Sequence, residues 1–138
     1  MNRIARQSVG VWLFWGGLNG FLAVALGAFG AHSLKERLGA LNTLAVWQTA
    51  SHYHVIHAVA LLVVALLAMN LTNTRWIRAI GWLFLVGILL FAGSLYALAL
   101  TGVKVLGAIT PFGGLCFLAG WILILLTGVQ NMKNTPKS

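Results

Sequence analysis

Long apolar segments separated by short polar connections dominate the chain. Four of them run without a charged residue, and they predict helical spans at residues 9–31, 43–71, 79–101 and 111–130. A helix that crosses a membrane needs about 20 mostly apolar residues, more than an ordinary core helix contains. The pattern therefore predicts an all-α fold, an integral membrane four-helix transmembrane bundle that forms a single domain over residues 1–138.

The connections refine the ends of these helices. The stretch 32–41, HSLKERLGAL, is short and amphipathic, which predicts an interfacial segment between the first and second spans. Asn42 is then expected to cap the second helix. The fourth helix is predicted to start at Pro111 with Thr110 as its cap, because proline suits the first helical position and disfavours helical geometry in the residue before it. A longer helix kinked at Pro111 is the alternative.

Composition agrees with a membrane protein and excludes several other classes. The chain is 60% apolar and only 7% charged, whereas a soluble domain is about a quarter charged. This hydrophobicity excludes disorder, and the single cysteine excludes an internal disulfide. The first span has a basic start like a signal peptide, but its apolar stretch is too long for one, so we expect it to be retained.

The basic residues predict the orientation. Six lie at the end that would hold both termini (Arg3, Arg6, Arg75, Arg78, Lys133, Lys137), and three lie at the other end (Lys35, Arg37, Lys104). The positive-inside rule then places the N- and C-termini in the cytoplasm. Because these charges are spread over the helix ends rather than gathered on one face, they indicate contacts with phospholipid headgroups and no binding of nucleic acid.

Small residues predict how the helices pack, since membrane helices associate where backbones approach closely. The first helix carries a seam with a mean period of 3.5 residues, and the fourth carries a similar line (Gly16, Gly20, Gly27, Gly30; Gly113, Gly120). We expect these seams to pack within the bundle. The alternative is that a seam packs against another membrane protein or against a second copy of the chain. Asn19, in the middle of the first helix, is expected to make an interhelical hydrogen bond.

Polar side chains are predicted to gather in the outer third of the bundle, as counted at 1.5 Å per residue from the cytoplasmic helix ends (His32, His54, His57, Ser94, Tyr96, Thr110). Three chemical uses are open to such a cluster: ligation of a transition metal, ligation of haem by His32 with His57, and a proton relay. Against a metal, the spans offer no carboxylate and the one cysteine lies on another helix; against a proton relay, the cytoplasmic half has no titratable partner to complete a path. The favoured interpretation is structural, with neutral histidines donating to carbonyls or hydroxyls and holding the second helix to the first and third. Neither a metal nor another cofactor is predicted.

Four segments resemble a known family: GAFGAHSLKERL (27–38), SHYHVIHAVALL (51–62), FAGSLYALAL (91–100) and ITPFGGLCFLAGW (109–121). They are similar, in the same order, to the YgdD-type family (domain of unknown function 423) of small uncharacterised bacterial inner-membrane proteins. The resemblance implies four spans in the inner membrane and no known activity. His52 and His54 are not part of the family pattern. The candidate residues that fall on family motif positions are His32, Tyr53, His57, Ser94, Tyr96, Thr110 and Pro111.

The sequence therefore predicts a non-enzymatic membrane protein, either an accessory or scaffold subunit or a lipid-interacting protein. Hydrolase chemistry is not expected, because Ser94 has no acid to orient a histidine and its surroundings are not a nucleophile elbow. The alternative is a binding or transport protein for a small ligand or proton. Its binding site would be the polar cluster in the outer third of the bundle, with Tyr53 as a further member (His32, Tyr53, His54, His57, Ser94, Tyr96, Thr110).

Overall fold

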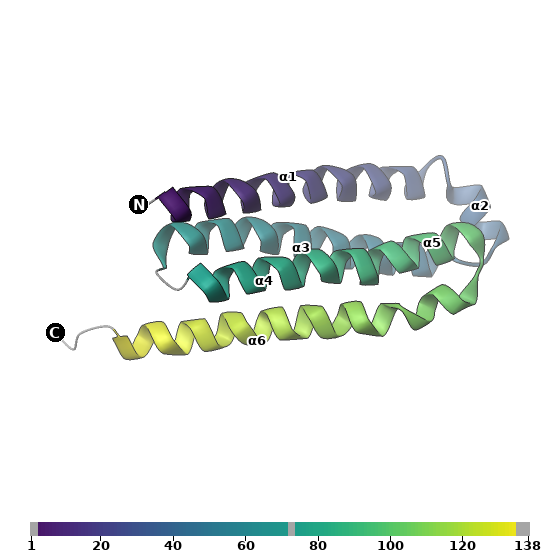
Figure 1. Cartoon of the computed structure of the whole chain (residues 1–138). Coiled ribbons are helices and arrows are strands. Elements are labelled where there is room, and N and C mark those ends of the chain that lie inside the picture. The colour runs from purple at the N-terminus through teal and green to yellow at the C-terminus, as the bar shows by residue number, and fades with distance from the viewer. Residues whose placement is uncertain (1–2, 72–73, 135–138) are drawn as a thin grey trace.

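The computed structural model describes residues 3–71 and 74–134, and these are almost entirely helical (Figure 1). The elements are α1 (Arg3–Ala31), α2 (Lys35–Ala40), α3 (Leu44–Asn70), α4 (Thr74–Gly87), a π-helix η1 (Ile88–Gly93), α5 (Ser94–Thr101), a 3₁₀ helix η2 (Lys104–Ala108) and α6 (Thr110–Asn134). α4, η1 and α5 follow one another without a break and form one rod. Four helices are thus long and apolar enough to cross a membrane, as predicted. Lys137, counted above among the basic residues, lies outside the described residues.

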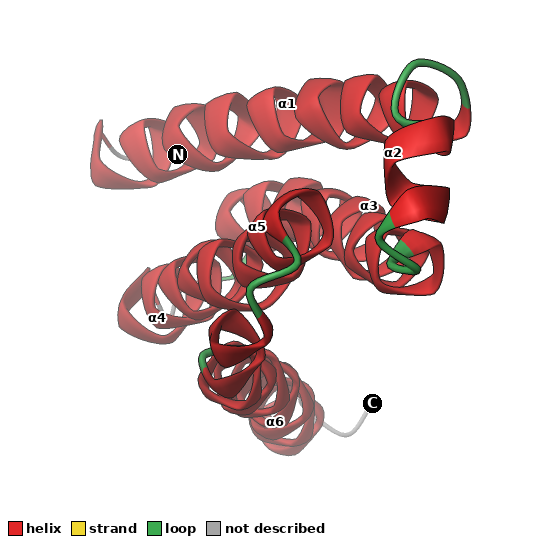
Figure 2. Ribbon diagram, turned by 90° about the vertical axis from the view of Figure 1, so that its right-hand side faces the viewer, coloured by secondary structure: helices red, strands yellow, loops and turns green. Residues whose placement is uncertain are grey.

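The four long helices lie in a curved row rather than at the corners of a closed square. α1 packs mainly on α3, α3 packs on the rod, and the rod packs on α6 (Figure 2). α1 and α6 therefore form the two edges of the row, and each has one side turned away from protein. The first residue of α1 and the last of α6 lie at the same end, opposite α2 (Figure 1).

Glycines let α1 lie close against α3. A Cβ added at Gly30 would lie 2.0 Å from Nε1 of Trp47, and one added at Gly16 would lie 2.6 Å from Cδ2 of Leu62. The seam thus packs inside the bundle at these positions and at Gly27, which faces Ser51. Gly20 departs from the predicted seam, because a Cβ added there would have nothing within 4 Å.

The fourth helix also uses its glycines for packing, as predicted. A Cβ at Gly113 would lie 2.4 Å from the backbone nitrogen of Phe91, and one at Gly120 would lie 2.5 Å from the ring of Phe84. The rod and α6 therefore approach so closely that only glycine fits at these two points.

Several helix ends differ from prediction. The first and third spans, which start with α1 and α4, begin several residues before the apolar runs at residues 9 and 79. Arginines near a helix end extend toward water while their backbone stays helical. Asn42 does not cap α3: its φ is +56°, and Thr43 stands at the cap position. The Thr43 hydroxyl donates instead to the Ala99 carbonyl of α5, at 2.8 Å.

The short helix α2 ties the far end of the bundle together. Its Leu38 is fully buried, and the guanidinium of Arg37 donates from Nε and Nη2 to the carbonyl of Leu100, at 3.0 and 2.8 Å. A cation at the C-terminus of a helix is favourable, because the last carbonyls lack intrahelical partners. Gly102, with φ of +74°, ends α5 in the left-handed conformation. The predicted segment is therefore a helix, and its depth at the interface stays a prediction.

The start of α6 lies within one residue of its predicted position. α6 begins at Thr110, Pro111 follows in its first turn, and the residues before them form the separate turn η2. The alternative of a longer helix holds in part, because η2 leads into α6 through Ile109 alone, with a change from 3₁₀ to α-helical geometry just before Pro111. The π-helix η1 has no counterpart in the prediction, since hydropathy does not distinguish a π-helix from an α-helix.

Candidate functional site

The predicted polar cluster is divided into separate sets. In the first, the buried His54 of α3 lies between Asn19 of α1 and Tyr96 of α5. His54 Nε2 is 3.2 Å from Asn19 Oδ1, and His54 Nδ1 is 3.4 Å from the Tyr96 hydroxyl. One side chain thus links three helices, and the interhelical bond expected of Asn19 is present.

The partners determine the tautomer of His54. Asn19 Nδ2 donates to the Trp15 carbonyl at 2.8 Å, so Asn19 Oδ1 is the atom that faces the histidine. A carbonyl oxygen only accepts, which means that His54 Nε2 carries the proton. In the neutral imidazole, His54 Nδ1 then accepts from the Tyr96 hydroxyl.

The second set surrounds His57, which is one turn further along α3 and also buried. His57 Nδ1 donates to the Tyr53 carbonyl at 2.8 Å, and Nε2 accepts from the indole N–H of Trp121 on α6 at 3.2 Å. The imidazole stacks on Phe117, with ring centroids 3.5 Å apart. His57 is therefore the opposite neutral tautomer from His54, and it links α3 to α6.

The third set joins the π-helix region to the start of α6. Ser94 Oγ donates to the Phe91 carbonyl at 3.1 Å and lies 2.9 Å from the Thr110 hydroxyl. Because Ser94 has one hydroxyl proton, Thr110 is the donor in the second bond. Thr110 thus pairs with Ser94 and does not cap α6 with its hydroxyl, contrary to prediction.

His32 does not join any of these sets. It is exposed, in the turn that follows α1. Its neighbour Gly30 lies against Trp47, which is ten residues before His57 on α3, about 15 Å along the helix. The haem alternative, in which His32 and His57 would share one ligand, is therefore not supported, because the antiparallel packing of α1 on α3 places the two histidines at different depths.

Cavities lie between the helices in the part of the chain that the structure describes. A groove of about 310 Å³ between α1 and the rod has Asn19, His54 and Tyr96 among its lining residues. A pocket of about 480 Å³ between α3 and α6, the aromatic pocket, is lined by rings and by residues of α6 (Tyr53, His57, Phe91, Phe117, Trp121; Pro111, Gly114, Leu115, Leu118). An aliphatic groove of about 350 Å³ adjoins it at Trp121 (Val55, Ile56, Val59, Ala60, Val63).

Comparison with known proteins identifies the family. The family model described as "Protein of unknown function (DUF423)" matches residues 26–114. The chain is 46% identical over 120 residues to the UPF0382 membrane protein YwdK of Bacillus subtilis, covering 87% of this chain and 97% of that one. The chain belongs to the DUF423 family. It is also 43% identical over 121 residues to a UPF0382 membrane protein of Staphylococcus epidermidis, covering 87% of this chain and 96% of that protein. No solved structure matches the chain.

Membership confirms the predicted family and a membrane protein of unknown function. The matched segment contains nearly all the candidate polar residues, from His32 to Pro111, but ends at Gly114. The DUF423 match therefore covers the α3 side of the aromatic pocket and stops short of Phe117 and Trp121.

The ring nitrogens of the two buried histidines of this DUF423 protein are occupied by protein groups. His54 and His57 each use one nitrogen as donor and one as acceptor. Among the described residues, no group of three His, Cys, Asp or Glu side chains is placed to hold a metal ion. The polar sets are thus arranged as bonds between helices.

Sequence reasoning missed Trp121 and Phe117 as partners of His57. Tryptophans favour the membrane interface, but Trp121 lies eleven residues into α6, about 16 Å from its start. The depth of Trp121 along α6, which can be counted from the sequence, distinguishes it from a tryptophan at the membrane interface. No sequence signal reveals which face of α6 meets α3.

Proposed function

We propose that this DUF423 protein is a non-enzymatic protein of the bacterial inner membrane that interacts with membrane lipids. The observation that carries the proposal is the open row of helices. Its cavities have mainly apolar walls, whereas the buried imidazoles are taken up in bonds between helices. Grooves of this kind, within membrane-crossing helices, are exposed to lipid chains.

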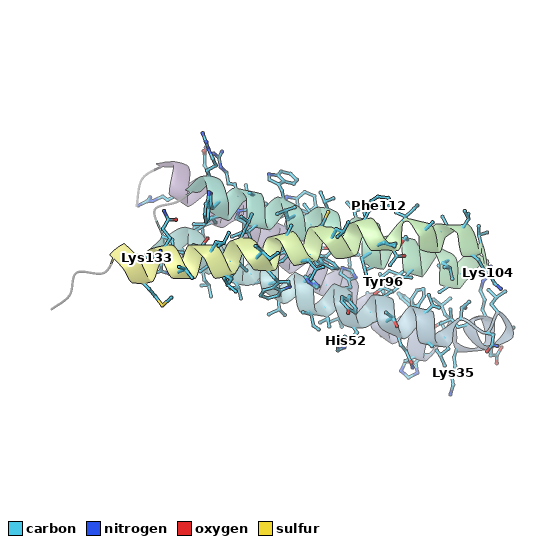
Figure 3. The ribbon with its side chains drawn as sticks, turned by 90° about the horizontal axis from the view of Figure 1, so that it is seen from below. Lys35, His52, Tyr96, Lys104, Phe112 and Lys133 are labelled. Atoms are coloured by element: carbon cyan, nitrogen blue, oxygen red, sulfur yellow. The ribbon has the colours of Figure 1, made fainter. Side chains whose placement is uncertain are left out.

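The proposed orientation has both termini in the cytoplasm. Lys35 and Lys104 lie at one end of the bundle and Lys133 at the other (Figure 3). Arg6, Arg75 and Arg78, near the starts of α1 and α4, belong to the Lys133 end. The excess of basic residues at that end supports a cytoplasmic location under the positive-inside rule.

The transport alternative receives less support. A relay needs titratable groups in one continuous path. The residues proposed for it lie in separate hydrogen-bonded sets, and His32 is apart from all of them. Lipid interaction requires no such path.

Native mass spectrometry of the protein released from membrane-derived nanodiscs tests the proposal. We expect protein with retained lipid and an absorption spectrum free of a Soret band. A stoichiometric metal or haem, or turnover of a substrate by the pure protein, would contradict the proposal. Protein released with a second polypeptide and without lipid would replace it with an accessory role in a complex.

A further inference from the structure

We infer that the aromatic pocket binds the ring of a neutral quinone-type lipid, whose apolar tail lies in the adjoining aliphatic groove. The inference rests on the proposed function and names the class of lipid. The pocket volume, about 480 Å³, falls in the range of small-molecule sites, which are mostly apolar with a few polar groups.

The rings of the pocket favour a flat ligand. The plane of His57 is within 7° of that of Tyr53 and within 10° of that of Phe117, and the planes of Tyr53 and Phe117 differ by 15°. His57 is held on both sides by hydrogen bonds, so the orientation of its ring is set before any ligand binds. Aromatic rings associate well in offset-stacked arrangements. A planar ring can therefore enter parallel to these three side chains and stack on them. A flexible acyl chain has no flat face and cannot stack in this way.

The charge of the surroundings calls for a neutral ligand. Every residue that lines the pocket is uncharged. The single acidic residue of the chain, Glu36, lies in α2 at the end of the bundle. A charged ligand would lose its hydration here and gain no counter-charge, which disfavours cationic ligands and phosphate headgroups at this depth.

Tyr53 supplies the polar contact. Its side chain is 39% exposed, and its hydroxyl makes no hydrogen bond to another residue of the described ranges. The other polar side-chain hydrogens in the pocket are already donated, that of Trp121 to His57 and that of His57 Nδ1 to the Tyr53 carbonyl. The Tyr53 hydroxyl is therefore the group available to donate to a ring carbonyl oxygen, which is the acceptor that a quinone offers.

The aliphatic groove accounts for the tail. It shares Trp121 with the aromatic pocket and continues along α3 as far as Val63. From Tyr53 to Val63 the two cavities extend about 15 Å along the helix, with rings at one end and aliphatic side chains at the other. A helix of a partner protein is about 10 to 12 Å across, so only roughly one of its turns would fit into the aromatic pocket. A single lipid can instead occupy both cavities, with its ring in the aromatic pocket and its tail in the aliphatic groove.

Two glycines of α6 give a matched test. A Cβ at Gly114 would meet only the Phe91 ring, at 3.8 and 3.9 Å, so Gly114→Leu is expected to fold and to fill the pocket. Gly128 has nothing within 4 Å of its added Cβ, and Gly128→Leu makes the same change outside the pocket. The full chain, in nanodiscs of phosphatidylethanolamine and phosphatidylglycerol, is titrated with a decyl-tailed benzoquinone. Binding is followed by native mass spectrometry and by quenching of tryptophan fluorescence.

We expect a saturable one-to-one adduct with the unmodified protein and with Gly128→Leu, weakened at least about tenfold by Gly114→Leu. Tyr53→Phe, which keeps the ring, is expected to weaken binding about fivefold, and this variant decides the matter if Gly114→Leu does not fold. Equal adducts in all variants would overturn the inference, because they would show partition into the bilayer only. Retention of phospholipid without the quinone would overturn the inference and leave the proposed function standing; loss of all lipid would overturn both.

Discussion

Gly113→Ala is expected to be among the most destabilising single-methyl changes in the bundle. The new Cβ would lie 2.4 Å from the backbone nitrogen and 2.8 Å from Cα of Phe91, inside the π-helix. A backbone cannot turn aside as a side chain does, so α6 must move away from the rod. We expect the free energy of unfolding to fall by about 2 to 3 kcal/mol, measured by denaturation in mixed micelles.

The neighbouring glycine provides the control for this prediction. Gly114→Ala places its Cβ at ordinary contact distance from the Phe91 ring, 3.8 Å. It should leave the bundle unchanged or stabilise it by up to about 1 kcal/mol, because alanine is a better helix former than glycine. Equal effects of the two substitutions would show that η1 and α6 do not approach as closely as described.

His57→Ala is expected to have the second large effect, because His57 joins α3 to α6. The substitution removes the stack on Phe117 and the acceptor for Trp121, and it leaves a cavity in a buried position. We expect the free energy of unfolding to fall by about 2 to 4 kcal/mol. His52→Ala, at an exposed position of the same helix, should change it by less than about 0.5 kcal/mol.

A double-mutant cycle separates the hydrogen bond from the packing. Trp121→Phe keeps an aromatic ring and removes the indole N–H that His57 accepts. Combined with His57→Ala, it should give a coupling energy of about 0.6 to 1.7 kcal/mol, the range of hydrogen bonds between membrane helices. Zero coupling, or full stability of His57→Ala, would mean that His57 does not hold the two helices together.

Much of the fold can be predicted because it depends on properties that act locally. A charge-free run predicts a membrane helix, and for the second span the prediction lies within one residue of each end, Leu44 and Asn70. Pro111 marks the start of the fourth helix for the same kind of reason. The true start of the third span, at α4, is less evident from the sequence, because arginines lie in the first turns of α4 and hydropathy records side chains and not backbone geometry.

The candidate site is less predictable because it depends on the order in which helices pack. Counting residues from the helix ends predicts one shared outer layer for His32, His54 and His57. In the structure His32 lies at a different depth from His57. Rotation about α3 and the row arrangement direct His54 toward α1 and α5 and His57 toward α6. The partners of His57, Phe117 and Trp121, come from a helix whose contact face hydropathy does not reveal.

The nitrogen NMR spectrum of ¹⁵N-histidine-labelled protein in nanodiscs at neutral pH tests the central claim, that the buried histidines are bonds between helices. The structure predicts two neutral imidazoles of opposite tautomer, His54 protonated at Nε2 and His57 at Nδ1, assigned with His54→Gln and His57→Gln. Both signals should stay unchanged when zinc or haem is added. Two identical tautomers, a charged imidazolium at either position, or a shift on adding metal would contradict the claim.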